Sequence, residues 1–212
     1  YSQSRDYIRD IGTEFISMGM RGKTVAIIGE ASPEWVFTYF SLMACGAITV
    51  PIDKELPEPD MLSIIRTAKC EYAVFSSVAE NKIAAIRGEY PELTGLVEWG
   101  GTTAEYARSI EDVRAAGKAR YLAGDNSYYD YEIDPEALAS IVFTSGTTGK
   151  GKGVMLSQKN ICSDMEQGIY NFLITPRTLC TLPPHHTFCS TVNLLGHYCQ
   201  GCDIYISSGL RY

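Results

Sequence analysis

The chain has 212 residues, of which 45% are hydrophobic and 20% are charged, as in globular proteins that bury a core. Its net charge of −7 disfavours nonspecific binding to nucleic acid or to anionic membranes. No apolar run approaches the ~20 residues of a membrane-spanning helix, and the N-terminus shows no signal-peptide pattern. A local loop can still bind phosphate in an acidic protein, so phosphate is a better candidate ligand than DNA.

Helical and strand patterns alternate along the sequence. Ser32 is a good N-cap residue and Pro33 suits the first turn of the helix that follows. In chain order we predict a helix over 8–18, a strand over 24–28, a helix over 32–46, a strand over 47–51, a helix over 59–68, a strand over 72–75, a helix over 79–87, a strand over 93–99, a helix over 104–116, a strand over 139–143, a helix over 157–172, a strand over 179–182, a helix over 191–198 and a strand over 203–206.

Strands that are continuous apolar runs, separated by helices, are typical of parallel sheets with helices on both faces. The sequence therefore predicts an α/β fold with a mostly parallel sheet. The polar, tyrosine-rich stretch over 124–135 is predicted to be a loop, and it is the one plausible internal boundary.

Seven cysteines are spread through apolar segments. An odd number of cysteines in such segments indicates reduced thiols in a cytoplasmic protein. Cys199 and Cys202 have the spacing of a zinc knuckle, but no second pair matches it. We expect these two to be small buried residues in and near a strand, and we expect no metal site. The other cysteines are Cys45, Cys70, Cys162, Cys180 and Cys189.

A loop rich in glycine, hydroxyl groups and lysine follows the predicted strand over 139–143. Glycines let backbone N–H groups approach a ligand closely, while hydroxyls and lysines add donors and positive charge. A plain surface turn needs none of these, so the loop is predicted to bind phosphate. The candidate phosphate-binding residues are Thr144, Ser145, Gly146, Thr147, Thr148, Gly149, Lys150, Lys152 and Gly153.

This loop also matches the first part of a P-loop, from Gly146 to Lys152. A P-loop continues with Ser or Thr, which holds magnesium, and with a helix that begins at the lysine. Here Gly153 follows, the apolar run 154–156 comes next, and the helix cap is expected only at Ser157. The P-loop interpretation therefore fails in both chemistry and local structure.

Three segments, in order, resemble the acyl-adenylating superfamily of acyl-CoA synthetases, luciferases and peptide-synthetase adenylation domains. The stretch 143–157 is similar to its signature loop, 31–36 with 44–52 to its early strand–helix–strand unit, and 182–188 to a motif beside its acyl pocket. Gly151 stands where the family usually has proline. The resemblance implies part of the large N-terminal domain of such an enzyme, most like a long-chain fatty-acid–CoA ligase.

The resemblance also implies a reaction. The loop would hold ATP, with Mg²⁺ as its counter-ion, while a carboxylic acid attacks the α-phosphorus. Acyl-AMP forms, and coenzyme A then displaces AMP. Backbone N–H groups and Lys152 would offset the anionic charge of the reacting groups.

The resemblance places His185, His186 and Phe188 beside the acyl pocket. His186 is expected near the acyl-adenylate, whereas a structural role explains His185 as well. No Asp or Glu lies between Leu182 and Val192, and a buried ammonium without a partner is costly. We therefore expect a fatty or aromatic acid as the substrate. Two alternatives stay open, an amino-acid-adenylating domain and a non-catalytic nucleotide- or protein-binding module.

Members of the superfamily are much longer than this chain. Residues 1–212 are therefore expected to be a piece of the N-terminal domain without the C-terminal domain. Half of a nucleotide site should bind weakly and not catalyse. An uncovered apolar face around 194–212 should favour self-association.

Overall fold

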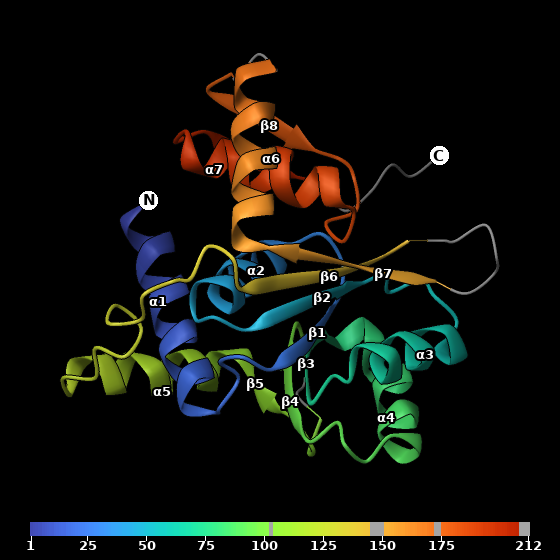
Figure 1. The fold of residues 1–212 in the computed structure, drawn as a ribbon. Helices are drawn as coiled ribbons and strands as arrows, with labels where there is room; N and C mark the ends of the chain where they lie inside the picture. Colours follow the sequence, from blue (N-terminus) through green and yellow to red (C-terminus); the bar gives the residue numbers. More distant parts are fainter. Residues whose placement is uncertain (102–103, 145–150, 172–174, 208–212) are drawn as a thin grey trace.

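The computed structural model describes residues 1–101, 104–144, 151–171 and 175–207. Over these residues the chain forms a seven-stranded sheet (Figure 1) in which neighbouring strands are parallel, except for the antiparallel pair β6 and β7. In spatial order the strands are β5 (Arg108–Ser109), β4 (Gly95–Trp99), β3 (Tyr72–Ser76), β1 (Thr24–Ile28), β2 (Ile48–Ile52), β6 (Leu138–Thr144) and β7 (Lys152–Ser157).

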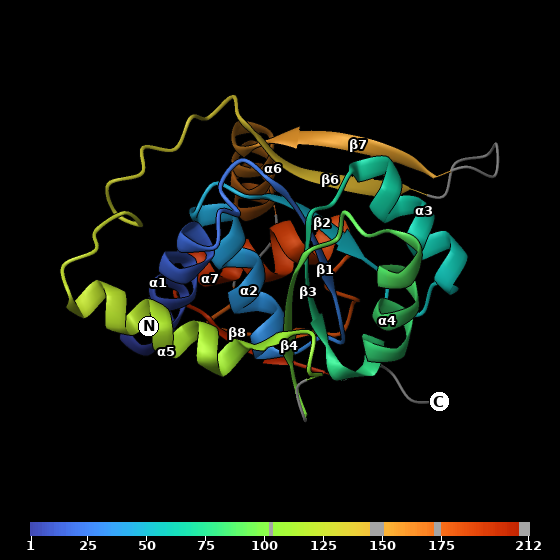
Figure 2. The same ribbon diagram turned by 90° about the horizontal axis from the view of Figure 1, so that it is seen from below.

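Helices cover both faces of this sheet, and each face has its own buried apolar cluster. One face carries α1 (Ser2–Ser17), α2 (Pro33–Ala44) and α5 (Ile110–Leu122), and the other carries α3 (Glu58–Ala68), the short helix η1 (Ser77–Ala79) and α4 (Glu80–Glu89). Figure 2 shows the two groups on opposite sides of the strands. The predicted α/β fold with a mostly parallel sheet is confirmed.

A second, two-stranded parallel sheet lies near α2, on the side of the seven-stranded sheet that this helix covers (Figure 1). It consists of β8 (Arg177–Cys180) and β9 (Asp203–Ile206), with α6 (Gln158–Asn171), the π-helix η2 (Cys189–Gly196) and α7 (His197–Cys199) around it. Cys180 of β8 and Ile161, Cys189 and Leu194 of the surrounding helices belong to the same apolar cluster as the buried residues of α1 and α2. The sequence predicted both strands, but not that they form a separate sheet.

The predicted helix starts at Ser32 and Ser157 are confirmed. The Ser32 hydroxyl accepts a hydrogen bond from the Trp35 backbone N–H at 3.2 Å, with Pro33 at the first helical position. The Ser157 hydroxyl accepts one from the Asn160 N–H at 3.2 Å. Each hydroxyl satisfies an N–H group that the first turn of a helix leaves without a partner.

The helix predicted over 104–116 begins later, at Ile110. Arg108 and Ser109 instead extend the sheet, pairing with Val97 and Glu98 of β4. The Ser109 hydroxyl then caps α5 by accepting a hydrogen bond from the Asp112 N–H at 3.0 Å. The start predicted at Ala104 was therefore wrong, because Arg108 and Ser109 pair with β4 and the helix can begin only after its N-cap residue, Ser109.

The tyrosine-rich segment 124–135 contains no regular element, as predicted, and lies against the first helices. The Tyr128 ring lies over Gly12 of α1, and the Arg21 guanidinium is 4.2 Å from the centre of the Tyr131 ring. Arg21 also donates a hydrogen bond to the Ser127 carbonyl at 3.0 Å. A domain boundary in this segment stays a prediction. Within the described ranges, no helix is long and apolar enough to cross a membrane.

The contact between α1 and α5 depends on Gly117. A Cβ atom added there would lie 1.8 Å from the Asp10 carbonyl oxygen, whereas one added at Gly88 of α4 meets nothing within 4 Å. We predict that Gly117→Ala destabilises the protein by about 3 kcal/mol, because backbone must move to relieve the overlap. Gly88→Ala should be neutral or stabilise by up to ~1 kcal/mol through helix propensity. Urea unfolding of both variants measures the difference, and equal midpoints would contradict this packing.

Candidate functional site

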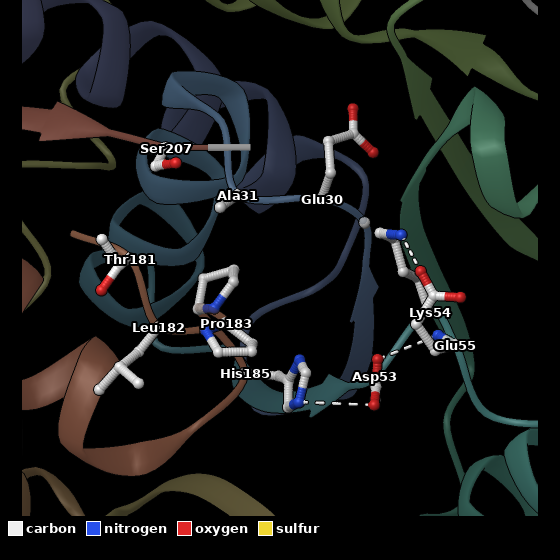
Figure 3. Close-up of a pocket in the computed structure, with 12 residues that line it drawn as sticks. Glu30, Ala31, Asp53, Lys54, Glu55, Thr181, Leu182, Pro183, His185 and Ser207 are labelled. Carbon is white, nitrogen blue, oxygen red and sulfur yellow. Dashed lines mark hydrogen bonds and ion pairs between the residues drawn. The ribbon is translucent and has the colours of Figure 1, made fainter. Parts of the chain in front are cut away.

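A pocket of about 200 Å³ opens beside the carboxyl ends of four strands. Its lining residues follow β1, β2, β8 and β9 and thus come from both sheets. Figure 3 shows the side chains after β2 facing those after β8 across the pocket. The lining residues are Gly29, Glu30 and Ala31 after β1, Asp53, Lys54 and Glu55 after β2, Thr181 to His185 after β8, and Ser207 after β9.

The order of the strands explains why the pocket forms between β1 and β2. These neighbours are parallel, and the chain leaves β1 for α2 on one face but leaves β2 for α3 on the opposite face. Loops that diverge in this way leave a crevice outside the carboxyl ends of the strands, where α/β proteins commonly bind ligands. The segment 181–185 closes the crevice from the side of the second sheet.

One electrostatic contact links the two walls of the pocket. His185 Nε2 lies 3.8 Å from Asp53 Oδ2, and Asp53 Oδ1 accepts a hydrogen bond from the Glu55 backbone N–H at 2.9 Å. Burial lowers the pKa of His185, His186 lowers it further, and the Asp53 carboxylate opposes both effects. Because the net change is downward, His185 is mostly neutral at neutral pH.

Two charged side chains of the pocket, Glu30 and Lys54, already have partners. The Ser76 hydroxyl donates a hydrogen bond to Glu30 Oε2 at 2.5 Å, and Lys54 pairs with Glu55. Lys82 Nζ donates to the Lys54 carbonyl at 2.6 Å and thereby fixes the loop after β2. With three carboxylates and one paired lysine, the pocket is a poor site for a triphosphate.

The predicted phosphate loop joins β6 and β7 as a hairpin. Thr144 and Lys152 face each other at its described end, while Ser145, Gly146, Thr147, Thr148, Gly149 and Lys150 lie outside the described residues. Because β6 is a parallel neighbour of β2, Thr144 lies at the same edge of the sheet as Asp53. Lys152 is exposed, and it forms no ion pair with any described acidic side chain. Phosphate binding by the hairpin remains a prediction.

The rejection of the P-loop is confirmed by the elements that follow Lys152. Lys152 is the first residue of the strand β7, and α6 begins only at Gln158. A side chain at Gly153 would place its Cβ 2.9 Å from Ile141 Cγ2 and 3.2 Å from the Phe143 ring. The packing of the hairpin thus favours glycine at the position where a P-loop has Ser or Thr.

The three residues predicted beside an acyl pocket do not all line the pocket at the ends of β1 and β2. His185 lines the pocket, whereas His186 is exposed and the Phe188 side chain is 38% exposed, and neither is among the lining residues. The His186 N–H donates to the Pro183 carbonyl at 3.0 Å, so the segment turns tightly there. The roles of these residues stay predictions.

Sequence reasoning missed Glu30, Asp53 and Lys54 as candidate site residues. They directly follow two apolar strands, and the rule that ligands bind at the carboxyl ends of parallel strands could have found them. The expectation that Cys199 and Cys202 are buried was wrong, because Cys199 is exposed and Cys202 is only half-buried. Among the described residues, no three His, Cys, Asp or Glu side chains are grouped to hold a metal ion.

Comparison with known proteins assigns the chain to a family. The AMP-binding enzyme family matches residues 1–211, and the chain belongs to this family. A CoA ligase from Gibberella moniliformis is 30% identical over 177 residues, which cover 82% of this chain and 27% of the relative. Long chain acyl-CoA synthetase 4 from Arabidopsis thaliana is 29% identical over 170 residues, covering 76% of this chain and 25% of the relative.

Among solved structures, the anthranilate CoA ligase AuaEII in complex with anthranoyl-AMP has a TM-score of 0.86 and 24% sequence identity. The match covers 99% of this chain and 40% of that one, and it shows similarity of fold. The chain thus spans about a quarter of the length of the curated CoA ligases and two fifths of this structural neighbour.

The charges around His185 predict how its pKa responds to substitution. Asp53→Asn should lower the pKa of His185, because the carboxylate that favours the imidazolium is lost, and His186→Gln should raise it. Titration of the histidine ring signals by NMR measures both shifts. A shift of the same sign in both variants would contradict the contact.

The low pKa of His185 also predicts how stability depends on pH. Below the ordinary histidine pKa of 6.5, the unfolded chain binds a proton at this residue more readily than the folded chain. The stability associated with neutral His185 is therefore present above about pH 6.5 and decreases as the pH falls. Urea unfolding of the protein and of His185→Gln between neutral and mildly acidic pH should show a weaker pH dependence in the variant.

Proposed function

We propose that this chain provides the phosphate-binding hairpin and part of the acyl side of an ATP-dependent carboxylate–CoA ligase. The observation that carries the proposal is the common edge of β1, β2 and β6. There an acidic pocket and an exposed lysine-bearing hairpin lie at the ends of neighbouring strands. Membership of the AMP-binding enzyme family and similarity to two curated CoA ligases support it.

The proposed reaction has two steps. A carboxylate oxygen of the substrate attacks the α-phosphorus of ATP, and the bond to pyrophosphate breaks, giving acyl-AMP. The thiol of coenzyme A then attacks the acyl carbonyl, and AMP leaves. Lys152 offsets negative charge on the leaving phosphates, and His186 lies near the acyl group in this proposal.

The charges of the described residues fit a site in which the hairpin binds phosphate and the pocket binds the acyl group. Lys152 is exposed without a described acidic partner, so it is available to a phosphate. The pocket carboxylates lie at the ends of the adjacent strands and would repel phosphate from that side. Mg²⁺ prefers oxygen ligands and commonly relies on the phosphates of a nucleotide for several of them.

A fatty or aromatic acid remains our preferred substrate. Glu30 and Asp53 bring carboxylates into the pocket, and this favours the amino-acid alternative because an ammonium could pair with them. However, Glu30 already accepts a hydrogen bond from Ser76, and Asp53 contacts His185 and the Glu55 N–H. Each carboxylate can still accept further hydrogen bonds, so the preference for an uncharged acyl chain rests on the similarity to CoA ligases.

Pyrophosphate exchange with labelled ATP in the full-length protein tests this function. We expect exchange that depends on a fatty or aromatic acid, followed by thioester formation when coenzyme A is added. Exchange only with amino acids would favour the amino-acid-adenylating alternative. ATP binding without exchange for any acid would favour a non-catalytic nucleotide-binding module.

We propose a cytoplasmic location, which suits the unbridged thiols of all seven cysteines.

Lys152→Ala should slow adenylate formation with little effect on folding, because the lysine side chain is exposed at the hairpin. The loss of one charge-assisted contact to the reacting phosphates should cost about 2–4 kcal/mol of transition-state stabilisation. Lys159→Ala is the matched control, since Lys159 is an exposed lysine that pairs with Glu136 on the surface. Pyrophosphate exchange measures both, and an equal rate in the two variants would refute the role of Lys152.

A further inference from the structure

Two buried thiols lie in contact at the base of the pocket wall. The Sγ atoms of Cys180 and Cys189 are 3.0 Å apart, and both side chains are almost fully buried. A disulfide has an S–S distance of about 2.05 Å, so the sulfurs need to approach by only roughly 1 Å to form one. Both thiols also lie near one acceptor, the Leu182 carbonyl, at 3.8 and 3.3 Å.

The two cysteines stand at the two ends of the segment that contains the pocket wall. Cys180 is the last residue of β8, and Cys189 is the first residue of η2. Between them runs the segment 181–188, whose residues 181–185 form one wall of the pocket. We propose that Cys180 and Cys189 are a redox-active dithiol, oxidised by a low-molecular-weight disulfide or hydroperoxide to a disulfide that closes a covalent ring around the segment 181–188.

The two sulfurs have different roles in this oxidation. A hydrogen bond from Cys189 lowers the pKa of Cys180, while that bond and burial raise the pKa of Cys189. Within the proposal we assign Cys180 as the attacking thiolate, because it also lies close in the chain to the exposed Leu182. With glutathione disulfide, Cys180 attacks one sulfur and releases one glutathione, Cys189 then loses its proton and attacks Cys180, and a second glutathione leaves. The protein loses two protons and two electrons, and glutathione disulfide gains them as it becomes two glutathione thiols.

Access to the sulfurs requires a local movement of the wall itself. Leu182 and Pro183, which lie between the two cysteines in the chain, are exposed, and β8 belongs to a sheet of only two strands. Two-stranded units and short exposed segments open more readily than a packed core. Cytosolic disulfides, where they form, are usually transient and redox-sensing, so the dithiol is expected to be reduced by default. This inference does not depend on the proposed enzymatic reaction.

The test uses the full-length protein with Cys162→Ser, Cys199→Ser and Cys202→Ser. These substitutions remove the described cysteines that are exposed or half-buried, including the alternative pair Cys199 and Cys202. After equilibration with mixtures of reduced and oxidised glutathione, the thiols are trapped by acid and alkylation and mapped by mass spectrometry. We expect a reversible cross-link between the peptides that carry Cys180 and Cys189. The unsubstituted protein is mapped in the same way, so that the cross-link can still be tested if the triple variant does not fold.

Single substitutions distinguish the roles of the two sulfurs. In Cys189→Ser, glutathione should remain attached to Cys180, whereas Cys180→Ser should bind much less glutathione. Cys45 and Cys70, which are buried and whose pKa values burial raises to about 12, serve as internal controls and should stay unmodified. Absence of the cross-link in folded protein at every glutathione ratio would overturn the proposal.

Hydrogen exchange tests the consequence for the pocket without any measurement of activity. Oxidation should slow amide exchange over 181–188 and leave β1 unchanged as a reference. A cross-link with unchanged exchange over 181–188 would refute the effect on the pocket wall.

Discussion

The divergence of the chain after β1 and β2 is the constraint on which the candidate site depends. The two strands are parallel neighbours, but α2 and α3 pack on opposite faces of the sheet, so the loops that lead to them must separate. Backbone N–H and C=O groups at the strand ends then have no neighbouring loop to cover them. Polar residues such as Glu30 and Asp53 can occupy this edge because it stays partly hydrated, whereas the strands themselves are almost wholly buried.

The second sheet turns this crevice into a pocket by supplying its outer wall. Its contact with the main body is largely apolar, since Ile161, Cys180 and Leu194 join the cluster that contains α2. That packing sets the position of the wall, and His185 adds only a weak electrostatic contact to Asp53. Because burial keeps His185 mostly neutral, Coulomb attraction contributes little at neutral pH, and the stability of the wall comes from packing.

The order and type of most elements could be predicted, because apolar runs and helix caps are local signals. Ser32 and Ser157 marked helix starts correctly, and the strand over 203–206 has the predicted bounds. The short strand β5 and the division into two sheets could not be predicted, because both depend on pairing between distant residues. The glycine loop was recognisable from composition, whereas Asp53 is meaningful only once the fold brings it to His185. A sequence pattern alone does not contain that proximity.

The pocket wall formed by 181–185 is subject to two interactions whose effects can be separated. Protonation of His185 would strengthen its attraction to Asp53 at the pocket face, whereas oxidation of the thiols would act at the base, where β8 and η2 meet. The first is electrostatic and weakens with salt, because both side chains are partly exposed. The second is covalent and insensitive to salt. A change in the wall that persists at high ionic strength but disappears on reduction must therefore originate at Cys180 and Cys189 rather than at the histidine.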